Sequence, residues 1–185
     1  AATSRGIPQA HAAEVWRQIA SFAGYAFCKA HSAAFARLSM QTCRLKAEAT
    51  APFMAAVLSN EGGYYAPHVY LEEARRWGLR ISGPDVNGSQ EEYWGYGTLL
   101  RVGLMAIRNL QHDSIARILT ARAGRPFSDM VDFLHRTRTG PGGLDPSQVE
   151  LLIVAGACDS LAPTRPEQLR LLLTHVKQCQ ALRER

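Results

Sequence analysis

The sequence lacks the features that place a protein in a membrane or in an oxidising compartment. None of its apolar runs approaches the roughly 20 residues that a transmembrane helix needs. Residues 1–8 lack the charged-then-apolar order of a signal peptide. The four cysteines, at positions 28, 43, 158 and 179, form no CxxC pair and no Cys/His spacing typical of a metal site. These absences predict reduced thiols in a cytoplasmic protein without a membrane partner.

An initiator methionine is also lacking, and we therefore expect a segment of a longer protein. The chain has 185 residues, of which 46% are hydrophobic and 20% are charged. This composition is sufficient for a buried core and argues against global disorder. The length suits one ordinary domain or two small ones.

The net charge of +5 is unevenly distributed along the chain. Residues 1–60 carry six basic and two acidic side chains, whereas residues 61–100 carry three and six. Residues 101–138 are basic again, with seven basic and three acidic side chains, and residues 139–185 carry equal numbers of both. Arginine accounts for 18 of the 21 basic residues, and its forked guanidinium suits phosphate. Two basic blocks around an acidic one indicate two contact surfaces, with nucleic acid as a candidate partner.

Apolar residues at helical spacing predict a mainly α fold of short helices with a small β-hairpin insert. The hairpin is expected within residues 93–102, where aromatic and branched residues surround Gly95 and Gly97. Trp16, Trp77 and Trp94 are interpreted as core anchors. The predicted divisions are a helical segment 1–80, a turn and hairpin connector 81–102, a helical unit 103–162 and a C-terminal helix 163–185.

Lys29 and His31 flank Ala30 at the start of a predicted helix. The free N–H groups of a helix N-terminus, a lysine charge and a histidine donor together suit a triphosphate. The alternative is a surface lysine beside a hydrogen-bonded histidine.

Three segments of the basic first block resemble the fingers region of the bacterial C-family DNA polymerases, which include the alpha subunit of DNA polymerase III. They read GYAFCKAHSAAFA (24–36), SMQTCRLKA (39–47) and FMAAVLS (53–59). Further matches follow in the same order: EARRWGL (73–79), PDVN (84–87), RVGLMAI (101–107), PFSD (126–129) and LLIVAGACDSL (151–161). The resemblance extends from about Gly6 to Leu172, and collinear matches are more specific than any single motif.

The resemblance implies part of a DNA-directed DNA polymerase, a nucleotidyltransferase of DNA replication. The family's catalytic carboxylates and its Mg²⁺ belong to a palm domain upstream, so no catalytic or metal-binding residue is expected here. The acidic pairs Asp129/Asp132 and Glu72/Glu73 fit a helix cap and solvated helix faces instead. The implied partners are primer–template DNA, a deoxynucleoside triphosphate, the remaining polymerase domains and, through the family alone, a sliding clamp. The matching fingers motif assigns Lys29 and His31 to the incoming nucleotide.

The second basic block resembles a tandem helix-hairpin-helix unit, in which N–H groups at a Gly-hydrophobic-Gly turn bind backbone phosphates. Asn109 and Gln111 occupy the expected glycine positions of the first hairpin. Asparagine tolerates a positive φ moderately and glutamine poorly. Asp113 adds a negative charge, which places the DNA contact in question. The candidate DNA-binding residues are Arg108, Asn109, Gln111, Ser114, Arg117, Arg122 and Arg125.

The second hairpin, Ala155-Gly156-Ala157, is interpreted as a structural partner, with Asp159 and Ser160 capping the helix that follows. An alternative to a polymerase segment is a protein of another functional class: a stand-alone helix-hairpin-helix module that binds DNA independently of sequence and has no enzymatic activity. A third hypothesis is a purely architectural helical domain. Neutralisation of about four phosphates predicts a slope near −3.6 for log K against log salt concentration, whereas the architectural hypothesis predicts no duplex binding.

Overall fold

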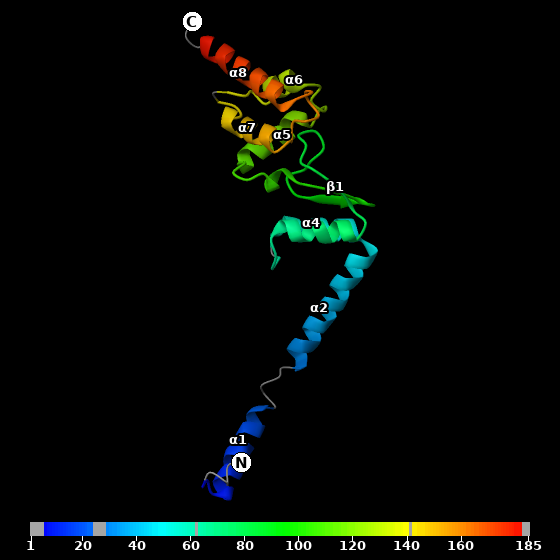
Figure 1. The fold of residues 1–185 in the computed structure, drawn as a ribbon, viewed down its shortest axis with the longest axis vertical. Helices are drawn as coiled ribbons and strands as arrows, with labels where there is room; N and C mark the ends of the chain where they lie inside the picture. The colour runs from blue at the N-terminus through cyan, green and yellow to red at the C-terminus, as the bar shows by residue number, and fades with distance from the viewer. Residues whose placement is uncertain (1–5, 24–28, 62, 141, 183–185) are drawn as a thin grey trace. The chain divides into compact units, whose positions relative to one another are not determined.

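The computed structural model describes residues 6–23, 29–61, 63–140 and 142–182. Within these ranges the chain is mainly helical with one small sheet (Figure 1), which confirms the predicted fold class. The elements in chain order are α1 (Gln9–Ala23), α2 (Lys29–Glu48), α3 (Thr50–Ser59), α4 (Pro67–Arg76), β1 (Arg80–Ser82), β2 (Trp94–Tyr96), β3 (Leu99–Arg101), the 3₁₀ turn η2 (Leu104–Ala106), α5 (His112–Arg122), α6 (Met130–Arg136), α7 (Pro146–Val154) and α8 (Arg165–Ala181). Among the described helices, none is both long and apolar enough to span a bilayer.

The chain divides into an N-terminal unit, residues 1–47, and a C-terminal unit, residues 48–185. This division differs from the predicted boundary at residue 80. The physical reason is a shared core, in which Met54 and Leu58 of α3 and Ala74 of α4 are buried together with Leu100 of β3. The predicted first segment therefore contributes its last two helices to the C-terminal unit.

The N-terminal unit consists of α1 and most of α2, and α2 has no buried residue along its described length. Apolar side chains are exposed on both helices, including Trp16 at 70% and Phe35 at 55%. The interpretation of Trp16 as a core anchor is therefore wrong for this unit. Trp77, in the C-terminal unit, is also largely exposed, and its indole N–H donates to Glu73 Oε1 at 2.8 Å.

The small sheet has the strand order β1-β3-β2, with β1 parallel to β3 and β2 antiparallel to β3. The β2–β3 pair is the predicted hairpin, and Gly97 in its turn has a φ of +56°. Helix α3 packs on this pair, and α4 packs beside β1 (Figure 1). A Cβ atom at Gly95 would lie 2.2 Å from the Ala51 carbonyl oxygen, so glycine permits the close approach of β2 to α3.

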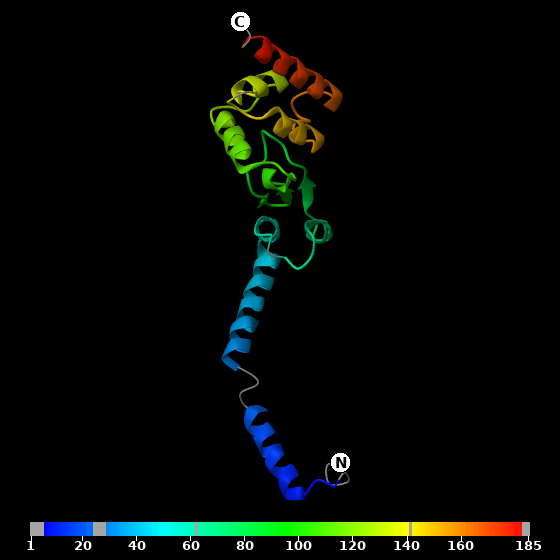
Figure 2. The ribbon, with the colours of Figure 1, turned by 90° about the vertical axis from the view of Figure 1, so that its left-hand side faces the viewer.

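Helices α5 to α8 enclose a second core, built around side chains such as Phe133, Leu152 and Leu172. Both views show these helices gathered together, with α8 packed on α6 and α7 (Figure 2). At the start of α6, Asp129 is the N-cap and its Oδ1 accepts the Asp132 N–H at 2.8 Å, as the interpretation of the Asp129/Asp132 pair as a helix cap predicted. Another predicted cap is wrong. Thr164, rather than the 159–160 pair, caps α8.

The turn after β1 joins the sheet to the helical bundle. Asp85 Oδ1 accepts the Asn87 N–H at 2.9 Å, an arrangement typical of an Asx turn. Val86 is fully buried, and its N–H donates to the Ala157 carbonyl at 2.8 Å. Ser160 Oγ donates to Asp85 Oδ2 at 2.7 Å. The turn is thus docked on the second hairpin, and Ser160 serves this junction.

Candidate nucleic-acid interface

The first hairpin connects η2 to α5 through residues 107–111. Asn109 has a φ of +65°, as expected at a glycine position. Gln111 has φ −78° and ψ 144°, which is extended backbone that any residue adopts. Only one of the two presumed glycine positions therefore requires the left-handed region, and the chain fills that position with asparagine, one of the residues that tolerates it best.

A buried glutamine of α7 supports this hairpin. Gln148 is 6% exposed, and its Oε1 accepts the Gln111 N–H at 2.8 Å. Its Nε2 donates to the Asn109 carbonyl at 3.4 Å. Gln148 is not among the candidate residues predicted from the sequence. The available signal was its spacing, because it stands four residues before Leu152 and therefore shares that residue's inward face.

Arg108 and Arg117 are exposed candidate cations of this region. Both side chains are exposed, and within the described part of the chain neither takes part in a hydrogen bond or ion pair. Arg108 lies on the hairpin, and Arg117 lies in the middle of α5. Arg125, also exposed, donates to Asp132 Oδ1 at 2.9 Å. Its charge is therefore partly compensated.

Two other candidates face inward. Ser114 is 6% exposed, so its hydroxyl does not lie on the surface of α5. Arg122 donates to the Val86 carbonyl at 2.8 Å and to Gln90 Oε1 at 3.2 Å. Partial burial lowers the pKa of Arg122, and the nearby Asp85 carboxylate opposes that shift. The guanidinium of Arg122 thus holds the turn after β1 against the end of α5.

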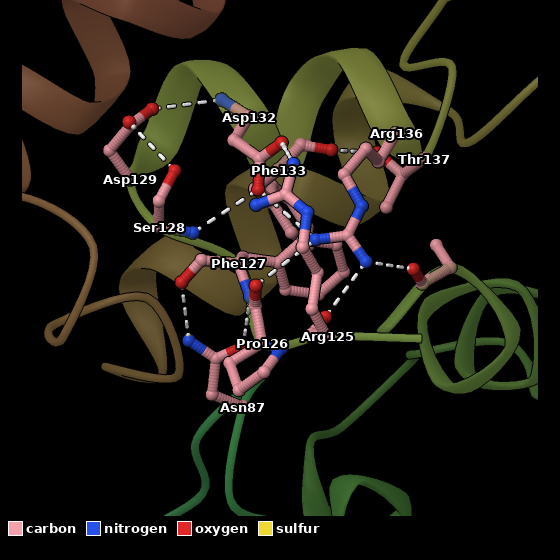
Figure 3. Close-up of polar contacts among 11 residues, drawn as sticks. Asn87, Arg125, Pro126, Phe127, Ser128, Asp129, Asp132, Phe133, Arg136 and Thr137 are labelled. Carbon is pink, nitrogen blue, oxygen red and sulfur yellow. Dashed lines mark hydrogen bonds and ion pairs between the residues drawn. The ribbon is translucent and has the colours of Figure 1, made fainter. Parts of the chain in front are cut away.

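Arg136 closes the loop between α5 and α6, a role that the sequence did not indicate (Figure 3). Its guanidinium donates to the carbonyls of Pro126 at 3.1 Å and Arg125 at 2.8 Å, and to that of Ala121. It lies 4.6 Å from the centroid of the Phe127 ring. Several carbonyls and an aromatic face converge on one planar cation, which suits arginine better than lysine.

The carboxylates near this loop are structural. The N–H of Asp132 and the hydroxyl of Ser128 lower the pKa of Asp129. Burial opposes a similar shift at Asp132, but the Ser128 N–H and the Arg136 guanidinium outweigh it and lower the pKa of Asp132. In the described ranges, no group of three or more His, Cys, Asp or Glu side chains is arranged to hold a metal ion.

Negative charge lies close to the first hairpin. Asp113 stands in the first turn of α5 and is exposed. His112 Nδ1 lies 2.7 Å from Oε1 of Glu91, which precedes β2. A polyanion that approaches this hairpin therefore meets two carboxylates as well as Arg108.

The second hairpin presents no comparable donor surface. Gly156 has a φ of +81°, and its N–H donates to the Ile153 carbonyl at 3.0 Å. Arg165 and Asp159 form an ion pair at 2.9 Å beside it. A Cβ at residue 156 would lie 2.5 Å from Nη2 of Arg165. The local groups are thus used in holding the bundle together.

Lys29 and His31 lie in the first turn of α2, in the N-terminal unit, and both are exposed. The His31 ring packs against Phe35 on the next turn, with centroids 4.5 Å apart. Residues 24–28 of the fingers-like segment GYAFCKAHSAAFA, including Cys28, lie outside the described residues.

Residues 78–168 match the family model of a helix-hairpin-helix motif. This range includes both hairpins, the turn after β1 and the start of α8. The match agrees with the resemblance drawn from the second basic block.

Curated relatives match most of the chain. The DNA polymerase III subunit alpha of Saccharopolyspora erythraea is 38% identical over 154 residues, which cover 82% of this chain and 13% of that protein. The error-prone DNA polymerase of Anaeromyxobacter dehalogenans strain 2CP-C is 37% identical over 174 residues, which cover 87% of this chain and 15% of that protein. The DNA polymerase III subunit alpha of Caulobacter vibrioides is 32% identical over 188 residues, which cover 99% of this chain and 16% of that protein.

Proposed function

Since the chain belongs to the family of bacterial DNA polymerase III alpha subunits and error-prone DNA polymerases, we propose that it contacts the backbone of primer–template DNA within such a polymerase. It spans 13 to 16% of the length of these relatives. Nucleotidyl transfer is accordingly proposed for the whole polymerase, with its carboxylates and Mg²⁺ outside these 185 residues. The isolated chain should show no nucleotide incorporation.

The observation that supports the DNA contact is the exposure of Arg108 on the first hairpin and of Arg117 in α5, the helix that follows this hairpin. Cations without a protein partner are available to neutralise phosphates, and they do so without reading sequence. Arg125 adds a third, weaker contact because Asp132 competes for it. Arg122 and Ser114 are not among the proposed contacts, because Arg122 donates to the Val86 carbonyl and Ser114 is buried.

A salt titration of duplex binding tests this proposal. With three phosphates neutralised, log K should fall against log salt concentration with a slope of about −2.7. A matched variant, Arg170→Ala, removes an exposed arginine of α8 and should leave the slope unchanged. Absence of measurable binding to a primer–template duplex at low salt would contradict the proposal and favour an architectural role.

We also propose that Lys29 and His31 face the incoming deoxynucleoside triphosphate in the assembled polymerase. The support is their exposure in the first turn of α2, where backbone N–H groups and partial positive charge favour an anion. In the full-length polymerase, Lys29→Ala should raise the KM for nucleotide or lower kcat. Unchanged kinetics would remove Lys29 from the site.

A further inference from the structure

The buried side chain of Gln148, in α7, makes hydrogen bonds to two backbone groups of the first hairpin. It accepts the Gln111 N–H at 2.8 Å and donates to the Asn109 carbonyl at 3.4 Å. We propose that Gln148 is the positioning residue of this hairpin: it holds Asn109 in the left-handed conformation that presents Arg108 to duplex DNA. The inference rests on the proposed DNA contact and adds a residue outside the hairpin to that site.

The backbone of the hairpin explains why such a residue is needed. Asn109 adopts a φ of +65°, a region that glycine enters freely and other residues enter at a cost. Asparagine tolerates this region better than most non-glycine residues, but the surrounding structure still has to offset the remaining cost. Gln148 binds the carbonyl of Asn109 and the N–H of Gln111, two residues later. It therefore fixes the backbone that follows Asn109.

The same contacts determine which groups are left for phosphate. The Gln111 N–H is already satisfied by Gln148, so a phosphate would have to displace a buried amide to reach it. Within the described residues, the N–H groups of Arg108 and Asn109 make no hydrogen bond to backbone or side chain. These two donors, with the exposed Arg108 side chain, form the surface that Gln148 positions.

A second buried glutamine provides a matched control. Gln168 of α8 is fully buried, and its Nε2 donates to the carbonyls of Cys158 at 3.0 Å and Ala162 at 3.3 Å. Like Gln148 it is a buried amide that makes two hydrogen bonds to backbone groups, although its Oε1 has no hydrogen-bond partner among the described residues, and neither of its bonds reaches Asn109 or Gln111. Any effect of simply losing a buried amide should appear equally in both variants.

The test compares Gln148→Met with Gln168→Met in the full chain, at a temperature where both remain folded. Methionine keeps the unbranched stem and removes the hydrogen bonds. We expect amide hydrogen exchange at Gln111 to accelerate in Gln148→Met only. Affinity for a primer–template duplex should fall roughly fivefold in that variant, with an unchanged salt slope, because the number of phosphates contacted stays the same.

A rescue distinguishes positioning from general stabilisation. Because glycine needs no support at positive φ, Asn109→Gly should abolish the effect of Gln148→Met, and the double variant should bind duplex as Asn109→Gly alone does. Equal losses in Gln148→Met and Gln168→Met, or no rescue by glycine, would overturn the inference. A wild-type chain that fails to bind duplex would instead overturn the proposed DNA contact, while exchange at Gln111 would still report whether Gln148 holds the hairpin.

Discussion

Asn87 and Phe127 are joined by a pair of reciprocal hydrogen bonds. The Asn87 Nδ2 donates to the Phe127 carbonyl at 2.9 Å, and the Phe127 N–H donates to Asn87 Oδ1 at 2.7 Å (Figure 3). One amide therefore pairs with both backbone groups of a residue 40 positions away. The pair fastens the turn after β1 to the loop between α5 and α6, so the sheet and the proposed DNA-binding helices hold a fixed relation within the C-terminal unit.

Replacement of Asn87 by alanine should destabilise the C-terminal unit by about 2 kcal/mol. The Phe127 side chain is buried, and the substitution leaves the N–H and carbonyl of that residue without partners. Urea unfolding followed by far-UV circular dichroism measures the change. Asn60→Ala serves as the control, because Asn60 is exposed and bonds only within its own helix end. Equal stabilities of the two variants would show that water replaces the Asn87 contacts.

The helices and the β2–β3 hairpin were predictable because their signals are local. Periodicity predicted a helix that starts near Lys29, where α2 begins, and a C-terminal helix within residues 163–185, where α8 lies. A turn after β1 was also expected, within the predicted connector 81–102. Its docking on the second hairpin was not, because that depends on partners more than 70 residues away, such as Ser160.

Polar residues with distant backbone partners were the main omission at the candidate site. Gln148 and Arg136 make hydrogen bonds to backbone carbonyls and N–H groups that only the tertiary fold brings close to them. No sequence motif therefore indicates the roles of these two residues. Arginine count alone could not separate Arg122, which holds Val86 and Gln90, from Arg117, which is exposed. The sequence thus indicated a basic region but could not assign its individual cations to surface or interior.

The cap of α7 should make stability depend on pH in the acid range. The hydroxyl and the N–H of Ser147 lower the pKa of Asp145 in the folded chain. The unfolded chain therefore takes up the proton first, and the stabilisation is present above pH about 4 and lost as pH falls through the folded-state pKa. Asp145→Ala should cost about 1 kcal/mol at pH 7, and this difference should shrink below pH 4.

Thermal unfolding of wild type and Asp145→Ala between pH 2 and 7 measures that dependence. The control is Glu150→Gln, which removes an exposed charge from α7 without touching its cap. A difference between wild type and Asp145→Ala that stays constant over the whole range would mean that the cap does not depend on the carboxylate charge.

Cys158 should resist thiol reagents in the folded protein. Its side chain is fully buried, and burial, followed by the nearby Asp85 and Asp159 carboxylates, raises its pKa to about 12. Because the thiolate is the nucleophile, its population at pH 8 is very small. Peptide mapping after brief alkylation at pH 8 should show Cys43, which is exposed, modified and Cys158 intact. Denaturation before alkylation should label both, and early labelling of Cys158 would contradict the buried environment.

Arg117 and Arg122 lie five positions apart in α5, yet their substitution should affect different properties. Arg117→Ala removes an exposed cation, so the salt slope of duplex binding should become shallower by about 0.9 while the free energy of unfolding changes by less than about 0.5 kcal/mol. Arg122→Ala leaves the Val86 carbonyl and Gln90 without their donor and should cost about 1–3 kcal/mol of stability. Its salt slope should match wild type wherever the variant is folded. If Arg122→Ala flattened the slope and Arg117→Ala did not, the DNA surface would have to run along the end of α5 and the turn after β1, rather than over the first hairpin.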